Sequence, residues 1–321
     1  MSLSLSRTLP ASWYTSDKIV DLAHDHIFDK GWLFVTPIAS FVRGHLDASQ
    51  FDFNGRPFFV INDIEDVYQC HDVCAYYGNY SEMMAGLSIE QVYSKIASVE
   101  KVRSYTHPSG LFFVCHDKKN APSWEDFYGK NLQQILKMHD FRKLQVRRRI
   151  SYDCKFNFIT FIDGYQECLH CTYTHPGLKA TLPLDVYKIE NLGNFSRHYC
   201  FDEKTGNEMN GVFLYFFPTS SLNFYQGGMS CFRVRPIDGN NSRMEFEYFF
   251  SGTDEEFEKY YKFARQVATE DQDLCEACQR NLQVGMYRGG ILNPSKENGV
   301  IHYQSLIRNR ILAGVRGLLF W

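Results

Sequence analysis

Long apolar runs are missing from this sequence, which has no stretch of about 18 apolar residues of the kind that a membrane-spanning helix needs. Residues 1–7 also lack the basic start and apolar stretch of a signal peptide. A basic surplus is missing too, since the formal net charge is -3 at pH 7. Nucleic-acid binding normally requires a basic face. We therefore expect no membrane and no nucleic-acid partner.

Cysteines are present, ten in 321 residues, but they lack the spacing of a disulfide framework. Reduced thiols in the cytosol explain such a pattern better than disulfides do. We therefore expect a cytoplasmic protein whose thiols are free.

The length of the chain allows two domains with sizeable cores, and aromatic residues make up a high 16% of it. We expect a helical segment over 1–39, a β-rich domain over 40–143, and a domain over 144–321 in which long helices pack on antiparallel strands, so the fold class is α+β. Periodicity and capping signals predict helices at 16–29, 88–99, 156–174, 254–282 and 300–312. Alternating or β-branched runs predict strands at 58–61, 66–69, 111–114, 144–150, 211–217, 221–225, 230–235 and 243–250.

Two histidines, His170 and His175, lie five residues apart just before Pro176. On an unbroken helix a five-residue step turns by about 500°, so the imidazoles would diverge. A residue before proline is disfavoured in the α region, so the helix should end near Thr174 and let His175 turn towards His170. Converging imidazoles suit a metal with open positions, although two hydrogen-bonded histidines at a helix end would explain the spacing as well.

Asp271 is the predicted third ligand, because it falls within an apolar stripe of the helix predicted at 254–282. The stripe comprises Phe257, Tyr260, Ala264, Val267, Asp271, Leu274, Cys278 and Leu282. A carboxylate on an apolar face is costly unless it binds a metal or pairs with a cation, such as Arg197 or Arg233. Two histidines and one carboxylate form the facial triad of non-haem Fe(II) enzymes, which leaves positions for oxygen and substrate.

Two Cys-x-x-Cys pairs, Cys168 with Cys171 and Cys275 with Cys278, suggest structural zinc as a different interpretation. Both pairs fall on predicted helices rather than in the turns that zinc ribbons use. Neither pair begins a helix after a strand, as a redox pair of this kind would. We therefore favour the iron site over zinc.

The histidine segment carries a resemblance to a known family. Tyr165-Gln-Glu167-Cys-Leu-His170-Cys with His175-Pro resembles the iron-binding signature of Rieske-type non-haem iron oxygenase alpha subunits, especially the choline, carnitine and glycine-betaine monooxygenase branch. Residues 270–279 are similar to the second signature of that branch, in which the aspartate binds iron. The resemblance implies a mononuclear Fe(2+) held by His170, His175 and Asp271, a helix-grip catalytic domain after a Rieske-like domain, and a homo-oligomer, by analogy a trimer.

The cluster ligands of that family have no counterpart here. Family members hold a [2Fe-2S] cluster through a Cys-x-His pair and a later Cys-x-x-His pair. The first pair should fall at Cys74 and Tyr76, where tyrosine replaces histidine, and residues 75–106 contain neither cysteine nor histidine. We therefore predict no [2Fe-2S] cluster.

Without a cluster, the resemblance implies an oxidoreductase that acts on a small organic substrate with O2 and takes electrons from the substrate or an external donor. A metal-dependent lyase, hydrolase or isomerase, or a non-catalytic homologue, is the alternative. Glu167, which in the family bridges to a neighbouring cluster, would hold His170 in one tautomer or act as a base on substrate. The pocket should lie between the antiparallel sheet and the long helix. We expect Asn223 and Tyr225 to contribute to catalysis. The lining should include some of Phe216, Phe217, Asn223, Tyr225, Phe232 and Phe249.

Overall fold

The computed structural model describes residues 6–41, 47–53, 56–62, 68–72, 91, 102–117, 119–202, 207–225 and 227–318. The chain divides into two compact units, one of Met1–Ile27 with Gln145–Trp321 and the other of Phe28–Leu144. The division at 1–39, 40–143 and 144–321 stays a prediction about domains. Within the described ranges, no helix is long and apolar enough to cross a membrane.

The described part of the smaller unit includes two three-stranded antiparallel sheets and an α-helix. The first sheet has the order β1 (Leu33–Pro37), β6 (Leu111–Cys115), β5 (Arg103–Thr106), and the second has the order β2 (Asp47–Phe53), β3 (Arg56–Asn62), β4 (Tyr68–Asp72). Strand β6 is apolar and fully buried, as its sequence predicts. Helix α4 (Trp124–Lys137) begins at Ser123, whose hydroxyl accepts the backbone N–H of Asp126.

Two sequence predictions for this unit lie outside the described residues. The helix predicted at 88–99 has only Gln91 within them. The cluster positions Cys74 and Tyr76 are not among them either. Both predictions therefore stay predictions.

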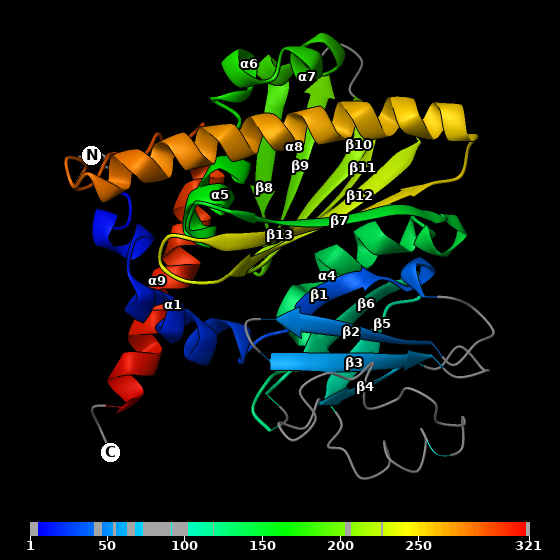
Figure 1. Cartoon of the computed structure of the whole chain (residues 1–321), viewed down its shortest axis with the longest axis horizontal. Helices are drawn as coiled ribbons and strands as arrows, with labels where there is room; N and C mark the ends of the chain where they lie inside the picture. Colours follow the sequence, from blue (N-terminus) through cyan, green and yellow to red (C-terminus); the bar gives the residue numbers. More distant parts are fainter. Residues whose placement is uncertain are drawn as a thin grey trace. The chain divides into compact units, whose positions relative to one another are not determined.

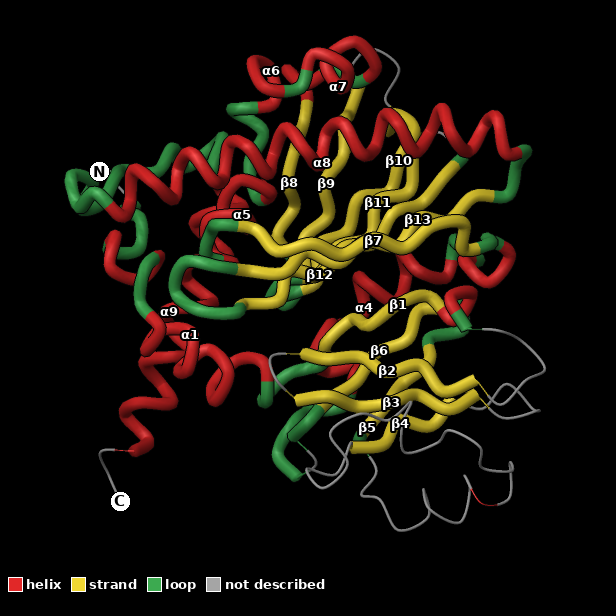
Figure 2. Tube along the Cα trace, in the orientation of Figure 1, coloured by secondary structure: helices red, strands yellow, loops and turns green. Residues whose placement is uncertain are grey.

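The larger unit is built on one antiparallel sheet of seven strands (Figures 1 and 2). Its order is β7 (Val146–Cys154), β13 (Ser242–Phe250), β12 (Gly228–Pro236), β11 (Ser220–Tyr225), β10 (Asn207–Phe216), β9 (Phe195–Asp202) and β8 (Tyr187–Asn191). The predicted strands of this region are present, and each pairs with its neighbour over five or more residues. This confirms the α+β class.

Helix α8 (Asp254–Gln283) crosses one face of this sheet (Figure 1). The residue that caps α8 is Thr253, one residue before the predicted Asp254. The side chain of Thr253 accepts the backbone N–H of Glu256, and the Glu256 side chain accepts the backbone N–H of Thr253, so the two residues form a capping box. A Cβ at Gly228 on β12 would lie 2.6 Å from the ring of Tyr260 on α8, so glycine permits this close approach. Helix α9 (Asn298–Leu318) extends beyond the predicted 300–312 at both ends.

The amino-terminal helix belongs to this unit and is shorter than predicted. Helix α1 covers Asp17–Ala23, and a π-helical turn, His24–Phe28, replaces the rest of the expected helix at 16–29. The carboxylate of Asp17 accepts the backbone N–H of Gly239, which ties the segment to the turn between β12 and β13.

The helix predicted at 156–174 is wrong in its middle. The chain forms α5 (Phe158–Tyr165) and α6 (Cys171–Thr174), with a break between them. In the break, the carboxylate of Glu167 accepts the backbone N–H groups of Leu169 and His170. Such side-chain acceptors compete with helical hydrogen bonds, which explains the interruption.

The apolar stripe predicted for α8 is confirmed at its two ends and wrong at Leu274 and Cys278. Phe257 and Tyr260 are buried, but Leu274 is 38% exposed and Cys278 is exposed. Leu282, the last residue of the predicted stripe, is buried, and the other buried positions in the second half of α8 are Cys275 and Gln279. Gln279 occupies the interior because its amide accepts hydrogen bonds from Asn157 and Thr160 and donates to Tyr14 and Asn240. A fully bonded amide is tolerated in a core, and periodicity alone does not reveal it.

Candidate metal centre

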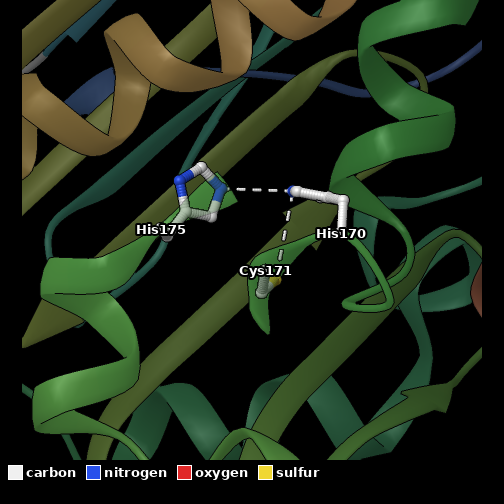
Figure 3. A group of neighbouring side chains, drawn as sticks. All are labelled: His170, Cys171 and His175. Atoms are coloured by element: carbon white, nitrogen blue, oxygen red, sulfur yellow. Dashed lines mark hydrogen bonds between the residues drawn. The ribbon is translucent and has the colours of Figure 1, made fainter. Parts of the chain in front are cut away.

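His170 and His175 are brought together by the ends of α6. His170 precedes the helix, and His175 lies between α6 and α7 (Pro176–Thr181) with φ -116° and ψ 75°, outside the α region. The helix ends at Thr174, as the following proline predicts. Their Nε2 atoms lie 3.2 Å apart, and Figure 3 shows the two side chains pointing towards each other.

Asp271 on α8 completes a triangle with these nitrogens. Its Oδ1 lies 3.3 Å from Nε2 of His170 and 3.0 Å from Nε2 of His175. A divalent transition metal lies ~2.1 Å from each nitrogen or oxygen ligand, so two ligands at right angles are about 3 Å apart. The three donor atoms therefore fit one face of an octahedral metal site and leave the opposite face open.

Each histidine has a carboxylate at its other ring nitrogen. Nδ1 of His170 contacts Oε1 of Glu167, and Nδ1 of His175 lies 2.8 Å from Oε2 of Glu270. A proton held on Nδ1 leaves the lone pair of Nε2 facing the centre of the triangle. Glu270 is a residue of this site that was not predicted from the sequence. Its position next to Asp271, about 100° round the helix, was the available signal.

The charges of the triangle depend on one another. Burial by itself lowers the pKa of His170, but hydrogen bonds to Asp271 and Glu167 outweigh it and raise the pKa to about 10. The pKa of His175 is raised in the same way by Asp271, against burial. Burial tends to raise the pKa of Asp271, yet the hydrogen bonds from both histidines hold it below its ordinary value. A metal would compete with these protons for the same donor atoms.

The alternative of an ion pair between Asp271 and an arginine finds no support at Arg233. This guanidinium instead contacts Glu245 at 3.1 Å and Glu247 at 3.5 Å. The other candidate, Arg197, lies over the ring of Tyr199. The contacts of Asp271 are with the two histidines.

A cavity of about 160 Å³ adjoins the triangle, and its described lining includes His170, His175 and Asp271. Asn223 and Tyr225 line it as expected, on the same face of β11 because they are two residues apart. Phe232 also lines it. Phe216, Phe217 and Phe249 are absent from the described lining and buried in the core. Phe249 follows the lining residue Tyr248 on β13, and successive strand residues face opposite sides.

Polar groups in and beside the cavity form hydrogen bonds that the sequence does not predict. The hydroxyl of Tyr165 donates to Oδ1 of Asn223 at 2.7 Å and lies 2.5 Å from the hydroxyl of Ser221. Tyr187 lines the cavity, and its hydroxyl contacts Nδ1 of the buried His198 at 2.8 Å. The hydroxyl of Tyr225 donates to the carbonyl oxygen of Thr181. The alternating pattern predicts strands here, but it does not reveal which hydroxyls meet.

The expectation that all thiols are free is wrong for one pair, because Cys168 and Cys171 form a disulfide. The bond joins residues that are only three apart, a separation that differs from the spacing of a disulfide framework. Cys275 and Cys278 are free thiols, the first buried and the second exposed. A four-cysteine zinc site is not assembled within the described part of the chain. One group that could hold a metal comprises His170, Cys171 and His175, but the disulfide engages the sulfur, so Asp271 is the better third ligand.

Comparison with known proteins identifies a matching family model and related sequences. A family model described as ring hydroxylating alpha subunit (catalytic domain) matches residues 141–202 and 199–313, more than half of the chain. The carnitine monooxygenase oxygenase subunit of Escherichia coli (strain K12) is 22% identical over 355 residues, covering 94% of this chain and 92% of that protein. The chloroplastic choline monooxygenase of Amaranthus tricolor is 23% identical over 344 residues, covering 92% and 76%.

Solved structures share the fold. The quaternary ammonium Rieske monooxygenase CntA in complex with L-carnitine has a TM-score of 0.75 at 18% identity, covering 95% of this chain and 96% of that chain. Naphthalene 1,2-dioxygenase from Rhodococcus sp. has a TM-score of 0.68 at 14% identity, covering 95% and 94%. The chain therefore belongs to the ring hydroxylating alpha subunit family, and it is a non-haem iron oxygenase of the Rieske type, in the carnitine and choline monooxygenase branch.

Proposed function

We propose that His170, His175 and Asp271 hold one mononuclear Fe(2+), and that the protein uses it to oxidise a small organic substrate with O2. The observation that carries the proposal is the triangle of donor atoms, with sides of 3.0 to 3.3 Å. Bound there, iron would supply the activation of O2, because a facial triad leaves coordination positions for oxygen and substrate.

The residues around the triangle have separate tasks in this proposal. Glu167 and Glu270 hold a proton on Nδ1 of each histidine and thereby direct both Nε2 atoms to one point. The contacts of Glu167 with His170 favour this orienting role over a role as a base on substrate. Asn223 and the hydroxyl of Tyr165 offer the substrate a hydrogen-bonding edge in an otherwise aromatic wall.

The size of the cavity supports a small substrate. An apolar cavity of about 150 Å³ holds a molecule the size of benzene, and the cavity beside the triangle measures about 160 Å³. The relatives are named for carnitine and choline. Aromatic side chains such as Tyr187, Tyr225 and Phe263 line the cavity and would suit an ammonium group of this kind.

The source of electrons is the main difference that we propose from a Rieske enzyme. Residues 75–106 contain neither cysteine nor histidine, so the second cluster ligand pair has no counterpart in the sequence. We propose that electrons come from the substrate or from an external donor. By analogy with the family we also propose a homotrimer, which light scattering of the purified protein would test.

The first experiment is metal and acid-labile sulfide analysis of anaerobically purified protein. One iron per chain without sulfide is expected. Iron in threefold amount together with sulfide would overturn the absence of a cluster. An Asp271→Ala variant is expected to lose the metal, and an Asp273→Ala variant, which changes an exposed carboxylate on the same helix, is expected to keep it. Retention of iron by Asp271→Ala would refute the ligand set.

The redox character of the reaction needs its own measurement. Substrate-dependent oxygen uptake by the iron-loaded protein is expected, and it should cease without oxygen. Turnover that continues unchanged under anaerobic conditions would favour a lyase, hydrolase or isomerase.

A further inference from the structure

The disulfide between Cys168 and Cys171 encloses the proposed ligand His170. Both cysteines line the cavity that adjoins the triangle. Sγ of Cys171 lies 3.9 Å from Nε2 of His170, and Figure 3 shows the sulfur beside that nitrogen. A ring nitrogen of His175 and this sulfur are within 4.8 Å of each other. One atom therefore belongs both to a disulfide and to a possible metal-binding group.

These two states of the sulfur exclude each other. A thiolate is a strong metal ligand, whereas a sulfur shared in a disulfide carries no charge to donate. With ligand distances of ~2.1 Å for nitrogen and ~2.3 Å for sulfur, the two atoms lie about 3.1 Å apart at right angles and about 4.4 Å apart in line. The observed 3.9 Å falls inside this range. This value lies between those of the two octahedral positions, so a small movement of the released Cys171 side chain would bring its sulfur to a ligand position.

We infer that the Cys168–Cys171 pair is a redox switch of the metal centre, an inference that rests on the proposed iron site. In the disulfide form, His170, His175 and Asp271 are the ligands and the other positions are open. In the dithiol form, the thiolate of Cys171 becomes a fourth ligand and occupies a position that oxygen or substrate would use. The oxidised form is then the active one.

The difference in exposure between the two cysteines determines which sulfur a reductant attacks. Cys171 is 6% exposed, whereas Cys168 is intermediate in exposure. A thiolate of an external dithiol attacks Sγ of Cys168, the sulfur–sulfur bond breaks, and the electron pair leaves with Sγ of Cys171. The second thiol of the reductant then releases Cys168, so that the dithiol becomes a disulfide and the protein gains two electrons and two protons. Metal binding displaces the proton of Cys171.

In a reducing compartment, a cysteine pair of this kind can have a regulatory role. Disulfides that occur there are usually transient, catalytic or redox-sensing rather than structural. A bond that spans only three residues constrains the unfolded chain little, so its contribution to stability is small. Its position around His170 is the feature that a sensing role explains.

Cobalt(II) provides the test, because thiolate ligation adds a sulfur-to-metal charge-transfer band in the near ultraviolet. The full chain is reduced with dithiothreitol or left oxidised, freed of reductant under nitrogen, checked by thiol titration, and loaded with cobalt(II). We expect the band in the reduced protein only, and its loss after reoxidation. Cys171→Ser should never show it, Cys168→Ser should show it without reduction, and Cys278→Ser, which changes an exposed thiol, should behave as the wild type.

The outcomes separate this inference from the proposed function. Cobalt that binds in both states without the band in the reduced protein overturns the switch and leaves the metal site intact. Failure of cobalt to bind in either state contradicts the metal site and the switch together. Oxygen uptake by the iron-loaded protein is expected to fall at least tenfold on reduction in the wild type and to stay unchanged in Cys171→Ser.

Discussion

Glu270 and Asp271, consecutive residues of α8, contact the two nitrogens of one imidazole ring. Oε2 of Glu270 lies 2.8 Å from Nδ1 of His175, and Oδ1 of Asp271 lies 3.0 Å from Nε2 of the same ring. The ring is 2% exposed, so these contacts set its orientation in a buried position. Helix α8 thereby supplies a proposed metal ligand, Asp271, and also the carboxylate of Glu270, which orients a second proposed ligand, His175.

The role of Glu270 predicts that its charge strengthens metal binding. Glu270→Gln should weaken the affinity for iron by roughly tenfold, because loss of a carboxylate behind a ligating histidine typically costs 10–100-fold. Competition with a chelator measures the change. Glu255→Gln, at an exposed position of the same helix, is the control and should leave the affinity unchanged. Equal affinities in all three proteins would show that Glu270 has no such role.

The two interpretations of Glu167 predict different results for Glu167→Gln. As the partner of Nδ1 of His170, the carboxylate should contribute to metal affinity, and the variant should bind iron roughly tenfold or more weakly. As a base on substrate, its loss would lower kcat and leave metal affinity unchanged. Chelator competition and oxygen uptake, measured on the same preparations, distinguish the two.

The buried amide of Gln279 is expected to stabilise the fold. Gln279→Leu leaves the N–H of Asn157 and the carbonyl of Tyr14 without their partner, and unsatisfied buried groups cost about 1–3 kcal/mol each. The free energy of unfolding in urea should fall by several times the change seen in Gln283→Leu. Gln283 is exposed on the same helix and donates to the same acceptor, Asn240. Similar losses in both variants would contradict the prediction.

The pH dependence of stability should report on Asp163. Burial raises the pKa of this carboxyl to about 7, although hydrogen bonds from Tyr14 and Gln304 oppose the rise. Between pH 4 and 7 the unfolded chain releases this proton while the folded protein keeps it, so the free energy of unfolding falls as the pH rises and levels off above pH 7.

Asp163→Asn cannot ionise, so this part of the decline should disappear. Relative to the wild type, the variant should gain on the order of a few kcal/mol between pH 4 and pH 8. Urea unfolding of the metal-free proteins at several pH values measures the difference. Parallel pH profiles for the two proteins would show that Asp163 keeps an ordinary pKa.

Several features followed from the sequence by itself. Pro176 predicts the end of α6 at Thr174, because the clash between a proline ring and the preceding residue is local. Alternation predicts five strands of the seven-stranded sheet but not β8 and β9, and capping signals predict the start of α8 to within one residue. The signatures around His170 and Asp271 indicated the family that the comparison shows.

Other features were decided only by the tertiary structure. Glu270 meets His175 across 95 residues of sequence, and Gln279 replaces an apolar residue in the core because four distant groups bond to it. The disulfide joins Cys168, in the break between α5 and α6, to Cys171 at the start of α6. Local sterics and periodicity act over a few residues, whereas these contacts depend on how the helices pack against the sheet, and no short segment of the sequence contains that information.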